Sequence, residues 1–128
     1  ESAATSALEI EGRVIRARRH ARGVAWFEFR ELCDGPRGKA DYIELARRYH
    51  TIMISSIPVF GDNEADIVRR FTWLVDEFYD RRVKLIVSAA AAPEDLYPHA
   101  EGGDQFQRTI SRLTEMQTRE YLSEPHLP

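Results

Sequence analysis

The sequence predicts a single α/β domain: an N-terminal antiparallel β-hairpin, then a βαβ unit with a parallel strand pair, flanked by a short helix and a long C-terminal helix. Two apolar runs, 51–56 and 83–88, lie on either side of a strongly amphipathic segment, 64–81. Short continuous apolar runs are typical of buried strands, and a helix between two of them returns the chain to form a parallel pair. A chain of 128 residues can form one core without disulfides or metals.

The N-terminal part is expected to be extended. Residues 8–19 alternate apolar and polar side chains, and the aromatic run 24–29 follows a turn at Gly23. A period of two is typical of strands with one buried face, so we expect these segments to form an antiparallel hairpin. Residues 1–7 are small and polar, and we expect them to form a disordered leader before a domain that spans 8–128.

The spacing of apolar side chains predicts three helices. Segment 41–49 has apolar residues at i, i+3, i+4 and i+7, with Asp41 as its expected N-cap. In the second helix, 64–81, Trp73 falls among the charged residues rather than in the apolar stripe, so we expect it to pack on a neighbouring surface. The last helix is expected to begin at Asp104 and to continue nearly to the C-terminus as one element.

The composition excludes several functional classes. The net charge is −3, from 18 basic and 21 acidic residues, which weighs against bulk nucleic-acid binding. Cys33 is the single cysteine, which excludes an internal disulfide and any multi-cysteine metal site. No apolar run reaches the roughly 20 residues of a membrane-spanning helix, and no signal-peptide pattern is present, so we expect a cytoplasmic protein.

A glycine-containing loop at 35–39, Gly-Pro-Arg-Gly-Lys, precedes a predicted helix in the way that a phosphate-binding loop does. Such a loop wraps phosphates with backbone amides and binds magnesium through a hydroxyl after the lysine. Here the glycines are three residues apart, Pro36 has no amide hydrogen, and Ala40 stands in place of the hydroxyl residue. A flexible turn is the better interpretation.

Other clusters also have structural interpretations. Asp76 and Glu77 could act as general acid or base, but neighbouring arginines favour an ion-paired helix face. Cys33 with His20 or His50 would suit a cysteine hydrolase, whereas a lone cysteine is more often a small buried hydrophobe. The parallel strands end in serines rather than in the carboxylates that hold magnesium in nucleotide hydrolases. We therefore expect neither a catalytic residue nor a metal site in this chain.

Two arginine clusters are candidate binding surfaces. Arg16 and Arg18 of the hairpin could contact an acidic protein or the phosphates of a nucleic acid, and a solvated strand face is the alternative. In the last helix, Arg108 and Arg112 could reach a phosphate. Pairing of Glu115 with Arg112 at i+3 and with Arg119 at i+4 would explain the row of arginines on this helix almost as well.

Several stretches, in the same order, resemble the ZapE-type cell-division ATPases, which are AAA+ proteins with mitochondrial relatives. Residues 69–80, RRFTWLVDEFYD, continue into 83–89, VKLIVSA. Residues 106–117, FQRTISRLTEMQ, are followed by EYL at 120–122. The resemblance extends over about residues 8–127, nearly the whole chain.

This resemblance implies the C-terminal domain of an ATPase that couples ATP hydrolysis to the remodelling of a protein assembly. In that family the phosphate loop and the magnesium-binding acids precede the matched region, so ATP and magnesium would belong to the longer protein. We expect this chain alone to be inactive. The implied partners are the remainder of the ATPase chain, a tubulin-like division protein and a second copy of this chain.

The resemblance also assigns roles to individual residues. Arg108 and Arg112 become candidate nucleotide-sensing residues, and Trp73 is expected to contact the hairpin, the ATPase region or a second copy. The alternative function is a non-enzymatic interaction module that binds an acidic protein or nucleic acid through Arg16 and Arg18. Binding of that kind would weaken steeply with salt.

Overall fold

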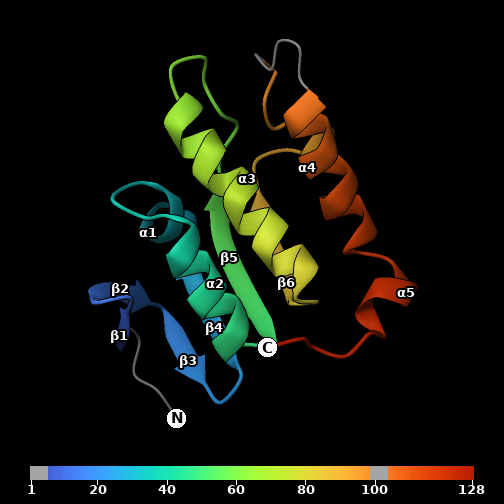
Figure 1. The fold of residues 1–128 in the computed structure, drawn as a ribbon. Helices are drawn as coiled ribbons and strands as arrows, with labels where there is room; N and C mark the ends of the chain where they lie inside the picture. The colour runs from blue at the N-terminus through green and yellow to red at the C-terminus, as the bar shows by residue number, and fades with distance from the viewer. Residues whose placement is uncertain (1–5, 99–103) are drawn as a thin grey trace.

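A four-stranded sheet forms the centre of the domain in a computed structural model, which describes residues 6–98 and 104–128 (Figure 1). The strand order is β3-β4-β5-β6; β3 runs antiparallel to β4, whereas β4, β5 and β6 are mutually parallel. A separate antiparallel pair, β1-β2, lies before it. The strands are β1 (Ser6–Ile10), β2 (Arg13–Ala17), β3 (Arg19–Ala21), β4 (Val24–Glu28), β5 (Thr51–Ile57) and β6 (Lys84–Ala89).

The helices gather on one face of this sheet (Figure 1). They are α1 (Phe29–Cys33), α2 (Lys39–Arg48), α3 (Ala65–Asp80), the 3₁₀ turn η1 (Pro93–Asp95), α4 (Asp104–Glu115) and α5 (Arg119–Leu122). α1 and α2 connect β4 to β5, and α3 connects β5 to β6. α3 packs against α2 on one side and α4 on the other. The predicted βαβ unit is therefore confirmed, and a second parallel connection precedes it.

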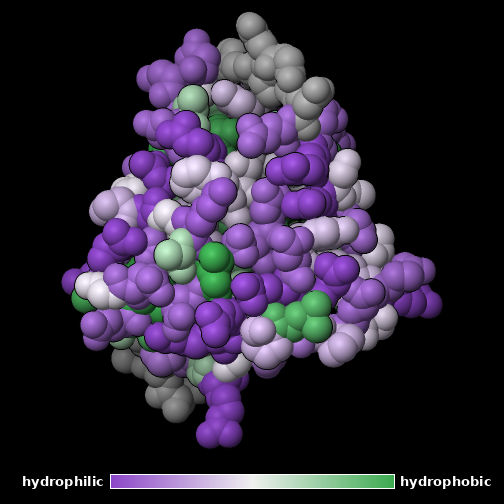
Figure 2. Space-filling model, viewed as in Figure 1, coloured by the Kyte–Doolittle hydropathy of each residue, from purple (hydrophilic) through white to green (hydrophobic). Residues whose placement is uncertain are grey.

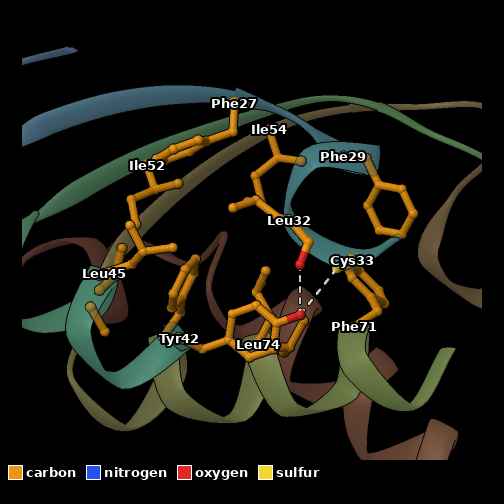
Figure 3. Packing of buried hydrophobic residues seen from close by; sticks show 14 of the residues in the cluster. Phe27, Phe29, Leu32, Cys33, Tyr42, Leu45, Ile52, Ile54, Phe71 and Leu74 are labelled. Atoms are coloured by element: carbon orange, nitrogen blue, oxygen red, sulfur yellow. Dashed lines mark hydrogen bonds between the residues drawn. The ribbon is translucent and has the colours of Figure 1, made fainter. Parts of the chain in front are cut away.

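The pleat of the sheet separates a buried face from an open one. Phe27 and Ile54 point toward the helices and belong to the hydrophobic core, where they are at most 1% exposed (Figure 3). On the opposite face, Trp26, Met53 and Ile86 occupy one row across β4, β5 and β6. Trp26 and Met53 are half-buried and Ile86 is exposed, because none of the described helices covers this face.

The predicted N-terminal antiparallel hairpin is confirmed as the pair β1-β2, and a second antiparallel pair, β3-β4, follows it. We expected 8–19 and 24–29 to form one hairpin, but β1 pairs with β2, and only the three-residue β3 pairs with β4. Ile15 and Ala17 of β2 are fully buried, so this strand packs into the core rather than extending the central sheet. Ser6 and Ala7, which fall in the expected leader, pair with β2, and residues 1–5 lie outside the described residues.

Some helix boundaries differ from the prediction, because side chains cap the helix ends in ways that the spacing of apolar residues does not reveal. α2 begins two residues before the expected N-cap, so Asp41 lies in its first turn and accepts a hydrogen bond from the Gly38 amide at 2.7 Å. The expected C-terminal helix is interrupted after Glu115. The Thr118 hydroxyl there accepts the Tyr121 amide hydrogen, which begins the short helix α5. The five-residue α1 was not predicted.

Asp41 anchors the β1-β2 pair to the start of α2. Its side chain is buried, and its Oδ2 atom also accepts a hydrogen bond from Arg13 Nη2 at 2.6 Å. This hydrogen bond raises the pKa of the Arg13 guanidinium. One carboxylate oxygen thus joins the loop before α2 to strand β2.

Replacing Asp41 by alanine should lower the free energy of unfolding by about 2 kcal/mol, because the helix start and a buried charged contact are both lost. Urea unfolding followed by circular dichroism measures the change. Glu44→Ala in the same helix is the matched control, since it removes only an exposed ion pair with Arg48 and should cost about 0.5 kcal/mol or less. Equal losses in the two variants would contradict the anchoring role.

Candidate functional site

Arg108 and Arg112 both bind one carboxylate on the neighbouring helix α3. Arg112 Nη1 lies 2.6 Å from Asp76 Oδ1, and Arg108 Nη2 lies 3.1 Å from Asp76 Oδ2. The two arginines are four residues apart in α4, so they project from the same face of the helix. Asp76 therefore uses both of its oxygens to join α4 to α3, and we call these three residues the Asp76 clamp.

Tyr79 extends the Asp76 clamp by one turn of α3. Its hydroxyl donates a hydrogen bond to Glu115 Oε1 at 2.8 Å, and this bond raises the pKa of the tyrosine. The Arg112 guanidinium lies over the Tyr79 ring, 4.7 Å from its centroid. The pairing of Arg112 with Glu115 is therefore wrong as an explanation of the arginine row: Arg112 binds Asp76, and Glu115 binds Tyr79.

The two arginines of the Asp76 clamp differ in accessibility. The Arg108 side chain is 53% exposed, whereas that of Arg112 is 25% exposed and is held by Asp76 and Tyr79 together. Arg108 could leave its ion pair with Asp76 and bind an incoming phosphate without rearrangement of the core. Asp76 would keep Arg112 as its partner, so no partly buried carboxylate would be left without a counter-charge.

The hairpin arginines have a different environment. Arg18 forms an ion pair with Glu28, and its guanidinium lies 4.4 Å from the centroid of the Trp26 ring. The Trp26 indole in turn donates a hydrogen bond to Ser55 Oγ at 2.6 Å. Arg16 is exposed, and its backbone amide donates to Glu31. Because the charge of Arg18 is balanced within the chain, this geometry adds no support to a nucleic-acid interface.

Trp73 lies half-buried on α3, beside the first turn of α2. Lys39 Nζ is 5.4 Å and the Arg69 guanidinium 5.8 Å from its ring centroid. Two cations at this distance from the ring explain how a tryptophan can occupy a charged helix face. Its contact on α2 was not among the three surfaces that we expected, and contact with another region or copy stays a prediction.

The serines near the ends of the parallel strands form hydrogen bonds within the sheet. Ser55 accepts the Trp26 indole hydrogen, and Ser88 Oγ accepts the Ser56 amide hydrogen at 3.0 Å. In the loop 35–39, Arg37 binds Glu31 with a side-chain separation of 3.1 Å. Ser55, Ser88 and Arg37 are thus engaged in hydrogen bonds or an ion pair within the chain.

Cys33 is fully buried in the core (Figure 3). Burial raises the pKa of its thiol to about 12, and the Tyr42 hydroxyl lies 3.9 Å from its sulfur. The Tyr42 hydroxyl also donates a hydrogen bond to the Leu32 carbonyl. His50 Nδ1 is engaged with Thr51 Oγ1 instead. A thiol that stays protonated in an apolar site is unsuited to nucleophilic attack.

Across 6–98 and 104–128, no group of three or more His, Cys, Asp or Glu side chains is placed to hold a metal ion. The helices of the same two segments include none that is long and apolar enough to cross a membrane.

Comparison with known proteins gives a consistent set of relatives. The profile of the AFG1-like ATPase family matches residues 1–125. Cell division protein ZapE of Escherichia coli K12 is 46% identical over 99 residues, which make up 77% of this chain and 26% of that protein. Uncharacterized protein C115.02c of Schizosaccharomyces pombe is 32% identical over 146 residues, covering 92% of this chain and 32% of that protein.

A vertebrate protein matches to a similar extent. Lactation elevated protein 1 homolog B of Danio rerio is 32% identical over 146 residues, covering 89% of this chain and 29% of that protein. The chain thus spans about a quarter to a third of the length of these relatives. No solved structure matches.

The two arginines of the Asp76 clamp should differ in their contribution to stability. Arg112→Ala removes a partly buried ion pair and a ring contact, and should lower the free energy of unfolding by about 1–2 kcal/mol. Arg108→Ala removes a more exposed pair and should cost about 0.5 kcal/mol or less. Urea unfolding of both variants is the measurement. A larger loss for Arg108→Ala would contradict the clamp geometry.

Cys33 should not react with iodoacetamide in the folded protein at pH 8. Its thiol is buried and stays protonated below a pKa of about 12, so modification requires unfolding. Mass spectrometry of timed samples gives the rate, with the chain in 8 M urea as the reactive control. Rapid labelling of the folded protein would restore the cysteine hydrolase as a candidate.

Proposed function

The chain belongs to the AFG1-like ATPase family, and we propose that it is the C-terminal α/β domain of an ATP-hydrolysing protein that remodels a protein assembly in the cytoplasm. The observation that carries the proposal is the family match over residues 1–125. The bacterial relative is named a cell division protein, so a tubulin-like division filament is the proposed assembly. ATP and magnesium would bind the longer protein, outside this domain.

The Asp76 clamp supports a nucleotide-sensing role for this domain. A sensing arginine must be exposed, and it must be fixed on a rigid element so that a small movement of the phosphate is transmitted. Arg108 meets both conditions, because it projects from α4 and α4 is joined to α3 by Asp76. Arg112 would then act as the positioning residue that holds Asp76 while Arg108 engages the phosphate.

A chimeric enzyme tests this proposal. The matching region of Escherichia coli ZapE is replaced by this chain, and ATP turnover is measured for the chimera and for the isolated 128-residue chain. We expect turnover by the chimera and none by the isolated chain. Arg108→Ala should lower turnover of the chimera about tenfold or more, since the phosphate loses a charged contact.

Two controls accompany the chimera. Arg119→Ala removes an exposed arginine of α5 and should leave turnover unchanged. The melting temperature of Arg108→Ala should stay within about 2 °C of the parent, because the lost pair is largely exposed. Unchanged turnover in Arg108→Ala would refute nucleotide sensing by this residue, and turnover by the isolated chain would refute its expected inactivity.

A further inference from the structure

One face of the central sheet is open in the described residues. We define this open face as the side chains opposite to the helices, centred on the row Trp26, Met53 and Ile86. Parallel strands are found almost exclusively in sheets that are covered on both faces. Here β4, β5 and β6 are parallel, but the connecting helices lie on a single side (Figure 1). A second layer is therefore expected on the open face.

The centre of the open face is a row of apolar side chains, with the Arg18 guanidinium over the Trp26 ring at one end. Ile86 is 57% exposed, and a shallow cavity of about 170 Å³ lies beside Trp26 and Met53. The cavity is lined mainly by apolar atoms of β3, β4 and β5. By contrast, the view onto the helices shows mostly hydrophilic residues with isolated hydrophobic ones (Figure 2). Exposed apolar side chains that adjoin one another mark interaction sites more strongly than scattered ones do.

The two edge strands of the sheet, β3 and β6, differ in how well they are protected from pairing with another strand. The β3 edge is three residues long and carries Arg19 and His20, which discourages pairing with another strand. The β6 edge is twice as long, with Lys84 as its single charged residue, and Ile86 and Val87 are 57% and 40% exposed. No described strand pairs with the outer side of β6. The unprotected edge and the open face meet at Ile86.

We propose that the open face and the outer edge of β6 form the docking surface for the ATP-binding region of the family, and this rests on the proposed function. The matched segments make up 26–32% of the relatives, so most of each relative lies outside the segment matched here and is available to cover this face. A region in the same polypeptide acts at a high effective concentration, which favours it over a second copy as the occupant. The surface is distinct from Trp73, which lies on the helix side.

Site-specific photo-crosslinking tests which region covers the open face. p-Benzoylphenylalanine replaces Ile86 in the ZapE chimera, and mass spectrometry identifies the crosslinked peptide after irradiation. We expect a peptide from the ATP-binding region of the same polypeptide. The matched control replaces Val14, which is equally exposed at 57% but lies on β2, and should give at least fivefold less crosslink to that region. The same probe in ZapE itself, at the residue aligned with Ile86, provides an independent arm in a natural protein.

Several results would overturn the proposal. Crosslinks at position 86 that join two copies of this domain would make the open face a homodimer surface. Crosslinks to unrelated proteins, or none above the Val14 control, would show that the ATP-binding region does not cover it. Each of these outcomes refutes docking of the ATP-binding region on the open face.

A stability comparison provides a second readout. Ile86→Glu should leave the melting temperature of the isolated chain within about 2 °C of the parent, since the side chain is exposed there. In the chimera the same change should lower the melting temperature by about 5 °C or more, whereas Val14→Glu should have little effect in either protein. Equal shifts in the isolated chain and the chimera would overturn docking.

The test of docking and the test of the proposed ATPase function give distinguishable results. ATP turnover is measured on the same samples. A chimera that hydrolyses ATP but shows neither the crosslink nor the selective destabilisation would refute docking and leave the ATPase function intact. A chimera that crosslinks at position 86 without turnover would support docking and refute the proposed function.

Discussion

The handedness of connections between parallel strands determines most of this structure. Because β4, β5 and β6 lie side by side in the order of the sequence, right-handed connections place α1, α2 and α3 on one face. The core forms on that face, where Phe27, Ile54, Phe71 and Leu74 meet (Figure 3). The same constraint leaves Trp26 and its row on the opposite face without a layer of helices.

α3 has a second role beyond connecting β5 to β6. Its apolar side packs on the sheet, but its polar side is not simply a solvent face. Asp76 and Tyr79 bind residues of α4, while Trp73 lies between cations from α2 and from α3 itself. The polar face thus makes contacts with both neighbouring helices, through Asp76 and Tyr79 to α4 and through Trp73 to α2, while Asp66 and Arg69 pair with each other at the exposed start of α3.

The parts of the fold that depend on local periodicity could be predicted, and those that depend on packing could not. The apolar runs and the amphipathic helix were sufficient for the β5-α3-β6 unit. Alternation in 24–29 does not show that β4 pairs in parallel with β5, because period two is common to both strand directions. The contact of Arg112 with Asp76 spans 36 positions and requires α4 to pack on α3, whereas Glu115 was the local alternative.

The proposed docking surface and the Asp76 clamp lie on different sides of the sheet, and β6 and α4 meet at a small cavity. Val87 of β6 lines a small cavity together with Leu113 and Gln117, and Leu113 follows Arg112 in α4. A region that covers the open face and reaches the outer edge of β6 therefore comes beside α4 without crossing the core. Because α4 is joined to α3 through Asp76, a region seated on the outer edge of β6 would lie next to the helix that carries both arginines of the clamp. One edge strand can in this way connect an apolar contact on one face with a charged contact on the other.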